Sequence, residues 1–243
     1  MKDYIKYLLQ RVLGYDNYLY YFSLYSISRV NINKYEKEFG HFLNMLSADS
    51  VVLDIGANIG ITTVPIAKKC RQGKVFAFEP IPSNLKALKR IVQHYKFNNV
   101  SFFGAALGDT NGSVQMVLPV LNKNKMQGLS HIVEDNNSDA WNKGDFFNVP
   151  LKKLDDIQEI NAQTIHAIKI DVEGFEYEVL KGAVNLLKKD RPVIYCEVWD
   201  NEKRSRCFNF IKELGYTIKV FSGEALVDYT NTPETNFFFC YNN

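Results

Sequence analysis

The pattern of hydrophobic and polar positions changes character near residue 50. Before that point, apolar residues recur at three- and four-residue spacing, which predicts one or two helices over residues 1–28 and, after a polar stretch, another over Lys34–Leu46. Seven of the chain's tyrosines also lie in residues 1–28. We therefore predict an N-terminal helical cap over residues 1–47 and a main domain over residues 48–243. The cap could also bind an acceptor, form a dimer or, less consistently with its mixed charges, lie on a membrane surface.

From residue 50 to residue 105, short apolar runs alternate with helical periodicity. The runs Val51–Ile55, Lys74–Phe78 and Val100–Ala105 predict strands. Between them, Ile61–Cys70 and Asn84–Tyr95 predict helices, the second capped by Ser83 or Asn84. Strands that alternate with helices in this way form parallel sheets with right-handed crossovers.

The second half of the chain breaks the alternation and then resumes it. Turn formers at residues 108–112 precede a predicted strand over Ser113–Leu118, and the polar residues 119–148 predict an irregular segment. The later predictions, in order, are strands over Val149–Leu154 and Ala167–Asp171, a helix over Glu176–Leu187, a strand over Pro192–Val198, a helix over Lys203–Leu214, and strands over Thr217–Phe221 and Asn236–Tyr241. The whole pattern predicts a doubly wound α/β fold with a mostly parallel, Rossmann-like sheet.

Composition and charge say more about the protein's partners and location than about its reaction. The formal net charge of the 243 residues is only +2, which gives no support for a nucleic-acid partner. The four cysteines are widely spaced and form no C-x-x-C pair, which argues against zinc and against a disulfide scaffold. No run of 18 apolar residues and no signal-peptide pattern occurs, so we expect a cytoplasmic protein without a membrane span.

The strongest local motif follows the first predicted strand. It reads Asp54-Ile55-Gly56-Ala57-Asn58-Ile59-Gly60, an acid and then a turn with two glycines before a helix. Glycine permits positive φ and close approach of a ligand, and a helix N-terminus offers free N–H groups. This spacing lacks the third glycine of the dinucleotide fingerprint. An acid here suits the ammonium of S-adenosylmethionine, while the N–H groups suit its carboxylate, so the motif favours that cofactor over NAD.

Two later segments extend the predicted cofactor site. Glu79, followed by Pro80, ends the second strand about 20 residues beyond the loop, where an acid can accept both ribose hydroxyls. Ala105 and Ala106 follow the third strand and leave room for an adenine ring. The cofactor-binding prediction covers Asp54, Gly56, Ala57, Asn58, Gly60, Glu79, Pro80, Ala105, Ala106 and Asp171. Turn capping is the structural alternative for Asp54 and Glu79, and a tight turn is the alternative for the alanines.

Over roughly residues 48–221 the chain resembles the FkbM family of methyltransferases. The resemblance rests on the glycine loop, Glu79-Pro80, Ala106-Leu107-Gly108-Asp109, Leu154-Asp155-Asp156, Ile168-Lys169-Ile170-Asp171-Val172-Glu173-Gly174-Phe175-Glu176, Val179-Leu180-Lys181-Gly182-Ala183 and Glu197. It implies the class I methyltransferase fold, a seven-stranded sheet with an antiparallel final hairpin. It also implies methyl transfer, often to a hydroxyl of a sugar or polyketide. The acceptor is therefore expected to be a small molecule or a glycan.

Three acids are the candidates for the chemistry. Asp171 and Glu173 flank a turn that Gly174 permits, and Glu197 ends the next strand. Crowded carboxylates raise one another's pKa, which suits a general base for a hydroxyl. We predict that Asp171 contacts the cofactor or the acceptor, and that Glu173 and Glu197 orient and deprotonate the acceptor. Helix capping by Glu173 and a structural role for Glu197 are the alternatives. A divalent cation is conceivable at this cluster, but no metal site is predicted.

Other residues and other functions stay open at this stage. His131 is a further candidate base, and Trp141 and Trp199 are candidates for stacking on a sugar, with solvation or core packing as the alternatives. An N-methyltransferase, an NAD-linked oxidoreductase and a non-catalytic binding module compete with O-methylation. The N-terminal helices are also a candidate surface for a homo-oligomer.

Overall fold

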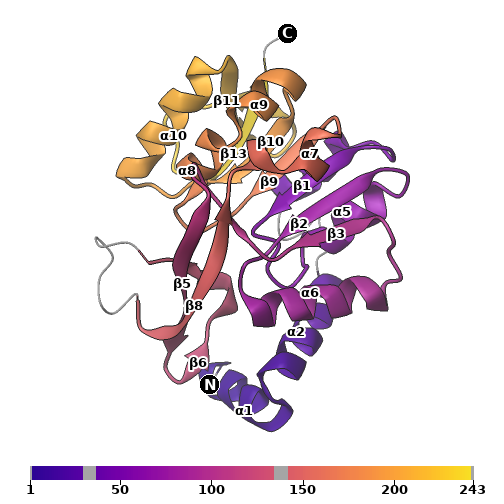
Figure 1. The fold of residues 1–243 in the computed structure, drawn as a ribbon, viewed down its shortest axis with the longest axis vertical. Helices are drawn as coiled ribbons and strands as arrows, with labels where there is room; N and C mark the ends of the chain where they lie inside the picture. The colour runs from indigo at the N-terminus through magenta and orange to yellow at the C-terminus, as the bar shows by residue number, and fades with distance from the viewer. Residues whose placement is uncertain (1, 30–36, 134–141, 242–243) are drawn as a thin grey trace.

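A central sheet of eight strands forms the middle of the protein (Figure 1). The computed structural model describes residues 2–29, 37–133 and 142–241. The sheet order is β12-β11-β13-β10-β9-β1-β2-β3. The strands are β1 (Val51–Ile55), β2 (Lys74–Phe78), β3 (Val100–Phe103), β9 (Ala167–Ile170), β10 (Val193–Glu197), β11 (Tyr216–Phe221), β12 (Leu226–Asp228) and β13 (Asn236–Tyr241). The first five are parallel to one another, and β13 runs antiparallel to both β10 and β11.

This topology confirms the doubly wound α/β fold, but the predicted count of seven strands is wrong. The eighth strand, β12, pairs antiparallel with β11 at the sheet edge. Its three residues are only half-buried or exposed, so they lack the alternating apolar pattern that marks a strand in sequence. A turn held by the Ser222 and Ala225 main chains, with Gly223 at φ +100°, returns the chain onto β11.

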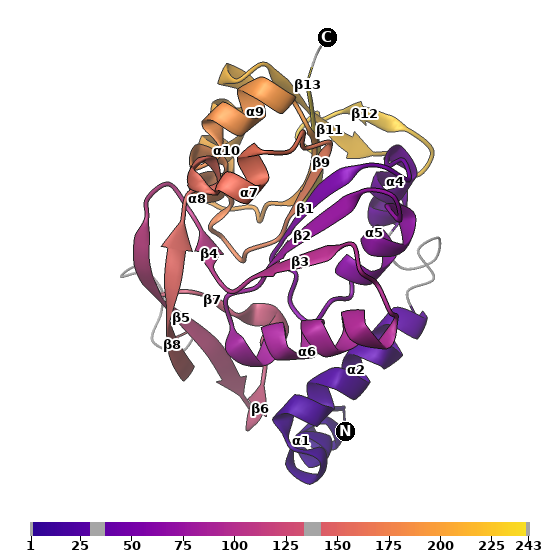
Figure 2. The ribbon, with the colours of Figure 1, turned by 45° about the vertical axis from the view of Figure 1, so that its right-hand side comes forward.

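Helices cover both faces of this sheet (Figure 2). Successive residues of a strand point to opposite faces, so they pack into two separate hydrophobic cores. Leu53 and Ile55 of β1 belong to the core under α7 (Gln158–Asn161), α8 (Glu176–Lys181), α9 (Val184–Asp190) and α10 (Glu202–Glu213). Val52 faces the other way, toward α4 (Lys37–Met45) and α5 (Thr63–Lys69). Helix α6 (Pro82–His94) packs on that second face through Leu88 and Val92 against Ala77.

Two helix predictions are corrected by the structure. The predicted helix over Glu176–Leu187 is two helices, α8 and α9, which separate at Gly182. A β-carbon on Gly182 would lie 1.9 Å from the Gly108 carbonyl oxygen, so the chain turns where it touches that loop. The predicted cap of α6 by Ser83 or Asn84 is also wrong. The helix starts at Pro82, with Ile81 at its cap position and no side-chain capping bond.

A second, smaller sheet lies beside the ends of the central strands (Figure 1). Its strands are β4 (Ala106–Leu107), β5 (Gly112–Leu121), β6 (Asn124–Lys125), β7 (His131–Ile132) and β8 (Gly144–Lys152), with a 3₁₀ turn, η1, at Gln127–Leu129. Strands β5 and β8 pair antiparallel from Gly112↔Leu151 to Pro119↔Gly144. The prediction of an irregular segment over residues 119–148 is therefore wrong in the part that the structure describes. The predicted strands Ser113–Leu118 and Val149–Leu154 cover part of β5 and the end of β8, but the pattern missed the start of β8, where Gly144, Asp145 and Asn148 interrupt the apolar residues.

Helices α1 (Lys2–Leu13) and α2 (Tyr15–Arg29) form the N-terminal segment. Helix α2 buries Leu19 against Ile59 and Ala87, and so packs on α6, while α1 contacts β6. The outward face of α1 is apolar, with Ile5 50% and Val12 78% exposed. Self-association through these helices stays a prediction, as does the boundary of the cap. Among the described residues, we find no helix whose length and hydrophobicity would let it cross a membrane.

The contact at Gly182 generates a stability prediction. Gly182→Ala should lower the free energy of unfolding by about 2 kcal/mol, because the added methyl group forces the α8–α9 turn away from Gly108. Gly112→Ala is the matched control: nothing lies within 4 Å of its added β-carbon, so the change should stay within about 0.5 kcal/mol. Urea unfolding measures both. Equal stability of the two variants would show that the Gly108 contact does not constrain the turn.

Candidate active site

The glycine loop lies between the ends of β1, β2 and β9. Gly56 and Gly60 adopt φ +75° and +90°, which a side chain would strain. A β-carbon on Gly56 would fall 1.8 Å from the Asp171 carbonyl oxygen, so only glycine lets β9 approach this closely. The Gly56 and Ala57 N–H groups donate to the Phe78 carbonyl at 3.1 and 2.9 Å. The loop therefore connects three of the segments predicted to form the site.

Glu79 is almost fully buried at the end of β2, with 4% of its surface exposed. One carboxylate oxygen accepts a hydrogen bond from the Asn58 N–H at 2.9 Å, and the other accepts from the Ile81 N–H at 2.8 Å. The Asn84 amide donates more weakly at 3.4 Å. Burial raises the pKa of Glu79 to about 7, although these hydrogen bonds oppose the shift.

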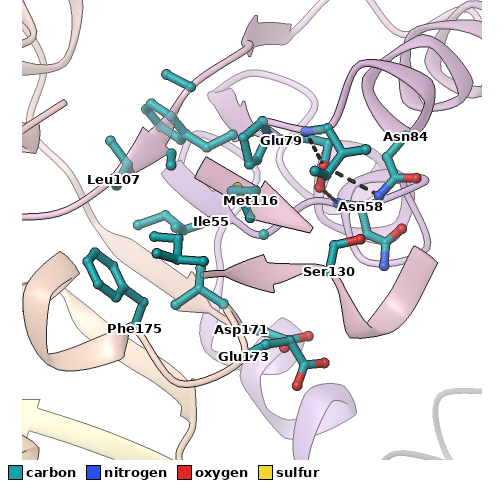
Figure 3. A pocket seen from close by; sticks show the side chains of 18 of the residues that line it. Ile55, Asn58, Glu79, Asn84, Leu107, Met116, Ser130, Asp171, Glu173 and Phe175 are labelled. Carbon is teal, nitrogen blue, oxygen red and sulfur yellow. Dashed lines mark hydrogen bonds between the residues drawn. The ribbon is translucent and has the colours of Figure 1, made fainter. Parts of the chain in front are cut away.

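A cavity opens beside Glu79 (Figure 3). Among the predicted cofactor residues, it is lined by Gly56, Asn58, Glu79, Pro80, Ala105, Ala106 and Asp171. Its charged lining residues are Glu79, Asp171 and Glu173, and no lysine or arginine lines it among the described residues. Three further lining residues carry buried side-chain oxygens without a hydrogen-bond partner in the described part of the chain: Asn58, Asn84 and Gln127. This first cavity thus offers acceptors to a ligand that brings hydrogen-bond donors.

A second cavity adjoins the first and shares Gly56, Asn58 and Asp171 with it. Its other polar lining residues are Thr62, Lys169, Tyr195, Glu197 and Asn236, and Ala57 also lies in its wall. Asp171 therefore faces both cavities, Glu173 the first and Glu197 the second. The three predicted acids lie near enough for Asp171 and Glu197 to raise the pKa of Glu173.

Asp54 lies beneath this site rather than in a cavity wall. It is fully buried, and its carboxylate accepts hydrogen bonds from the Thr62 and Thr63 hydroxyls, the shortest at 2.6 Å. Lys169 places its ammonium 3.7 Å from Asp54 and 3.4 Å from Asp171. The same ammonium donates to the Gly56 carbonyl at 3.0 Å. Asp54 thus braces the start of α5 and the glycine loop, and any contact it makes with a cofactor stays a prediction.

The ammonium of Lys169 stays charged in spite of its burial. Burial alone lowers the pKa of this group, but the carboxylates of Asp171 and Asp54 outweigh it, and the net shift is upward. Lys169 was not predicted as a site residue. The signal available in the sequence was a lysine inside the otherwise apolar strand Ala167–Ile170, and a buried strand accepts a lysine only where partners neutralise it.

Glu173 occupies the turn between β9 and α8 with a left-handed φ of +54°. Burial, together with Asp171 and Glu197, raises its pKa to about 8. It is not the cap of α8, because that helix begins at Glu176 with Phe175 at the cap position. Instead, the Glu176 carboxylate accepts a hydrogen bond from the Gly174 N–H at 2.9 Å. Glu173 is left to line the first cavity.

The other candidates lie away from the two cavities. His131 is buried, with Nδ1 2.8 Å from the Leu129 carbonyl oxygen and Nε2 3.2 Å from the Asn142 side chain. Trp199 is 48% exposed and lines neither cavity. Trp141 falls outside the described residues. Within the described ranges, no three His, Cys, Asp or Glu side chains are grouped so that they could hold a metal ion.

Comparison with known proteins decides the family. The model of the methyltransferase FkbM domain matches residues 54–218, more than half of the chain. The chain belongs to the FkbM methyltransferase family. This confirms the resemblance drawn from the motifs. The methyltransferase FkbM structure from Methylobacillus flagellatus KT has a TM-score of 0.54 at 18% identity, and the match covers 80% of this chain and 44% of that one. Its similarity supports the fold.

Two curated proteins are similar to part of the chain. Methyltransferase 1 of Beauveria bassiana is 27% identical over 150 residues, which cover 55% of this chain and 58% of that protein. The 2-O-methyltransferase NoeI of Sinorhizobium fredii is 28% identical over 166 residues, covering 63% of this chain and 65% of NoeI. The chain thus spans little more than half the length of the first of these curated relatives. SMU.1697c of Streptococcus mutans, a structure in complex with SAH, has a TM-score of 0.50 at 14% identity, over 84% of this chain and 94% of that one.

The buried ion pair predicts a large effect of one substitution. Lys169→Met should lower the free energy of unfolding by about 3 kcal/mol, because it leaves Asp54 ionised in the core without its cation. Lys181→Met removes an exposed pair with Asp109 and should cost less than about 1 kcal/mol. Chemical denaturation of both variants checks the difference. Similar losses would mean that Asp54 is satisfied by the two threonines alone.

Proposed function

We propose that the protein transfers a methyl group from S-adenosylmethionine to a hydroxyl of a small-molecule or glycan acceptor, a sugar in particular. One observation carries the choice of cofactor: the first cavity is lined by three carboxylates and by no lysine or arginine in the described part of the chain. A dinucleotide would bring a diphosphate into that acidic cavity, whereas S-adenosylmethionine brings a sulfonium and an ammonium. The NAD-linked oxidoreductase is disfavoured on the same ground.

The residues present fit the nucleoside of this cofactor. Ribose hydroxyls and an adenine amino group are donors, and Glu79, Asn58, Asn84 and Gln127 present carboxylate or unpartnered amide oxygens to the first cavity. Pro80, Ala105 and Ala106 supply small apolar walls. A structure of related fold has been determined with SAH, which supports the same choice. When bound, the cofactor supplies an electrophilic methyl group on a sulfonium. After methyl transfer, the sulfur is left as a neutral thioether.

The second cavity is the proposed acceptor site. Its lining is polar, with Tyr195, Glu197 and Asn236 beside Asp171, and such groups suit a ligand rich in hydroxyls. Asp171 lies where the two cavities meet, so its carboxylate can orient an acceptor hydroxyl. Glu173 and Glu197 are the proposed recipients of the hydroxyl proton. The name of NoeI, a 2-O-methyltransferase, supports oxygen as the acceptor atom.

Cofactor affinity should depend on pH through Glu79. The pKa of this carboxyl is about 7 without ligand, and ribose hydroxyls donate best to its ionised form. Affinity for S-adenosylmethionine should therefore be nearly full above about pH 8 and fall as the pH drops through about 7. Titration calorimetry across this range measures the change. In Glu79→Gln the affinity should be lower and nearly independent of pH, and a retained pH dependence would assign the effect to another group.

Turnover should show a separate dependence through Glu173. Because its pKa is raised to about 8, the carboxylate that accepts a proton becomes available only as the pH rises through 8. The methyl-transfer rate with an acceptor should rise over pH 7–9, and Glu173→Gln should remove that rise and lower turnover at least tenfold at pH 9. Glu197→Gln should lower turnover and move the inflection to lower pH, because it removes a charge that raises the pKa of Glu173. Unchanged turnover in both variants would contradict the base assignment.

A further inference from the structure

Part of the wall of the first cavity comes from η1. Gln127 begins this turn and is 8% exposed, and its side-chain oxygen has no hydrogen-bond partner among the described residues. Its main-chain carbonyl is fixed, since it accepts from the Ser130 hydroxyl at 3.2 Å and from the Asn58 side-chain amide at 3.4 Å. The main chain of Gln127 is thus held against the glycine loop. Its buried amide oxygen is left for a donor that the protein itself does not supply.

Helix α1, near the N-terminus, holds the residues just before Gln127 through hydrogen bonds. The side-chain amide of Gln10, on α1, donates to the Lys125 carbonyl at 3.0 Å and accepts from the Lys125 N–H at 3.1 Å. This reciprocal pair imitates one rung of a β-ladder. Asn124 adds a bond from its side-chain amide to the Asp3 carbonyl at 3.2 Å. Helix α1 therefore holds β6 two residues before the cavity wall begins.

Apart from α1, strand β6 is held by β5 and by an ion pair at 2.7 Å between Lys125 and Asp145 of β8. It pairs with β5 through only two residue pairs, Val120↔Lys125 and Leu121↔Asn124. The next main-chain bond, from the Met126 N–H to the Pro119 carbonyl at 2.8 Å, closes the same short hairpin. One edge of β6 pairs with β5, and on the other edge the Gln10 side chain satisfies the Lys125 main chain. The position of η1 relative to the glycine loop thus depends on α1, which precedes the segment matched by the family.

We propose that Gln127 is a cofactor-binding residue whose side-chain oxygen accepts a hydrogen bond from the nucleoside, and that Gln10 is the positioning residue that holds it there. The proposal rests on the assignment of the first cavity to S-adenosylmethionine. The N-terminal helix then contributes to cofactor affinity without touching the cofactor, because it fixes the wall before the ligand arrives and reduces the ordering cost of binding.

The test is calorimetric titration of the full chain with SAH. Gln127→Leu should weaken binding roughly fivefold, the effect of one lost hydrogen bond, and Gln10→Ala roughly threefold. The double variant should bind no more weakly than Gln127→Leu alone, because Gln10 acts only through Gln127. Val12→Ala is the control on the same helix: the side chain is 78% exposed, and the affinity should not change. Thermal unfolding of each variant identifies any loss that comes from unfolding.

The outcomes separate the two levels of the proposal. If the unaltered protein does not bind SAH, the cofactor assignment itself fails. If the unaltered protein and Gln127→Leu bind SAH equally well, Gln127 does not contact the cofactor. If the losses of affinity from the two substitutions multiply in the double variant, Gln10 does not act through Gln127. Amide hydrogen exchange of the unaltered protein provides a measurement free of mutation. SAH should slow exchange at residues 125–129, and unchanged exchange there would overturn the proposal.

Discussion

The buried ammonium of Lys169 is the interaction on which the site depends. It lies within 3.7 Å of Asp54 and 3.4 Å of Asp171, and it also caps the Gly56 carbonyl. Parallel strands β1 and β9 both end here, and their carbonyls and acids would otherwise repel one another. One cation on β9 therefore lets two carboxylates and the glycine loop share a small volume. The close approach of Gly56 to the Asp171 carbonyl is possible because glycine has no β-carbon.

The acids of the site fall into two groups, those beside Lys169 and those whose pKa is raised by burial. Asp54 and Asp171 lie beside Lys169, whereas burial raises the pKa of Glu79 to about 7 and that of Glu173 to about 8. Acids kept apart in this way can serve different roles at one pH. One carboxylate can hold ribose hydroxyls, and another can take a proton from an acceptor. The two adjoining cavities give these roles separate places, with Asp171 between them.

The parallel half of the fold could be predicted because local pattern and tertiary position agree there. Strand Val51–Ile55 is apolar, is followed by turn glycines, and is buried on both faces. The edge strand β12 was not predicted, because its three residues are too few to show an alternating pattern. The predicted strands Ser113–Leu118 and Val149–Leu154 cover only part of β5 and β8, and the pairing of these strands is decided by partners distant in the sequence. The split between α8 and α9 depends on the contact of Gly182 with Gly108, which no local periodicity records.

The candidate site shows the same division. Glu79 and Gly56 belong to short motifs at strand ends, so their meeting at one edge follows from the topology. Gln127 lines the cavity from a segment predicted to be irregular. Gln10 positions it through hydrogen bonds to Lys125, which lies 115 residues further along the sequence. Asp54 was predicted to face a cofactor, whereas the structure places it under the loop beside Lys169, a lysine that only the folded structure explains.

The most direct test is a crystal structure of the protein grown with SAH. The account predicts the nucleoside in the first cavity, with ribose hydroxyls within hydrogen-bond distance of the Glu79 carboxylate and the thioether sulfur directed toward Asp171. SAH bound at another surface, or in the first cavity with its ribose away from Glu79, would contradict the assignment of this site.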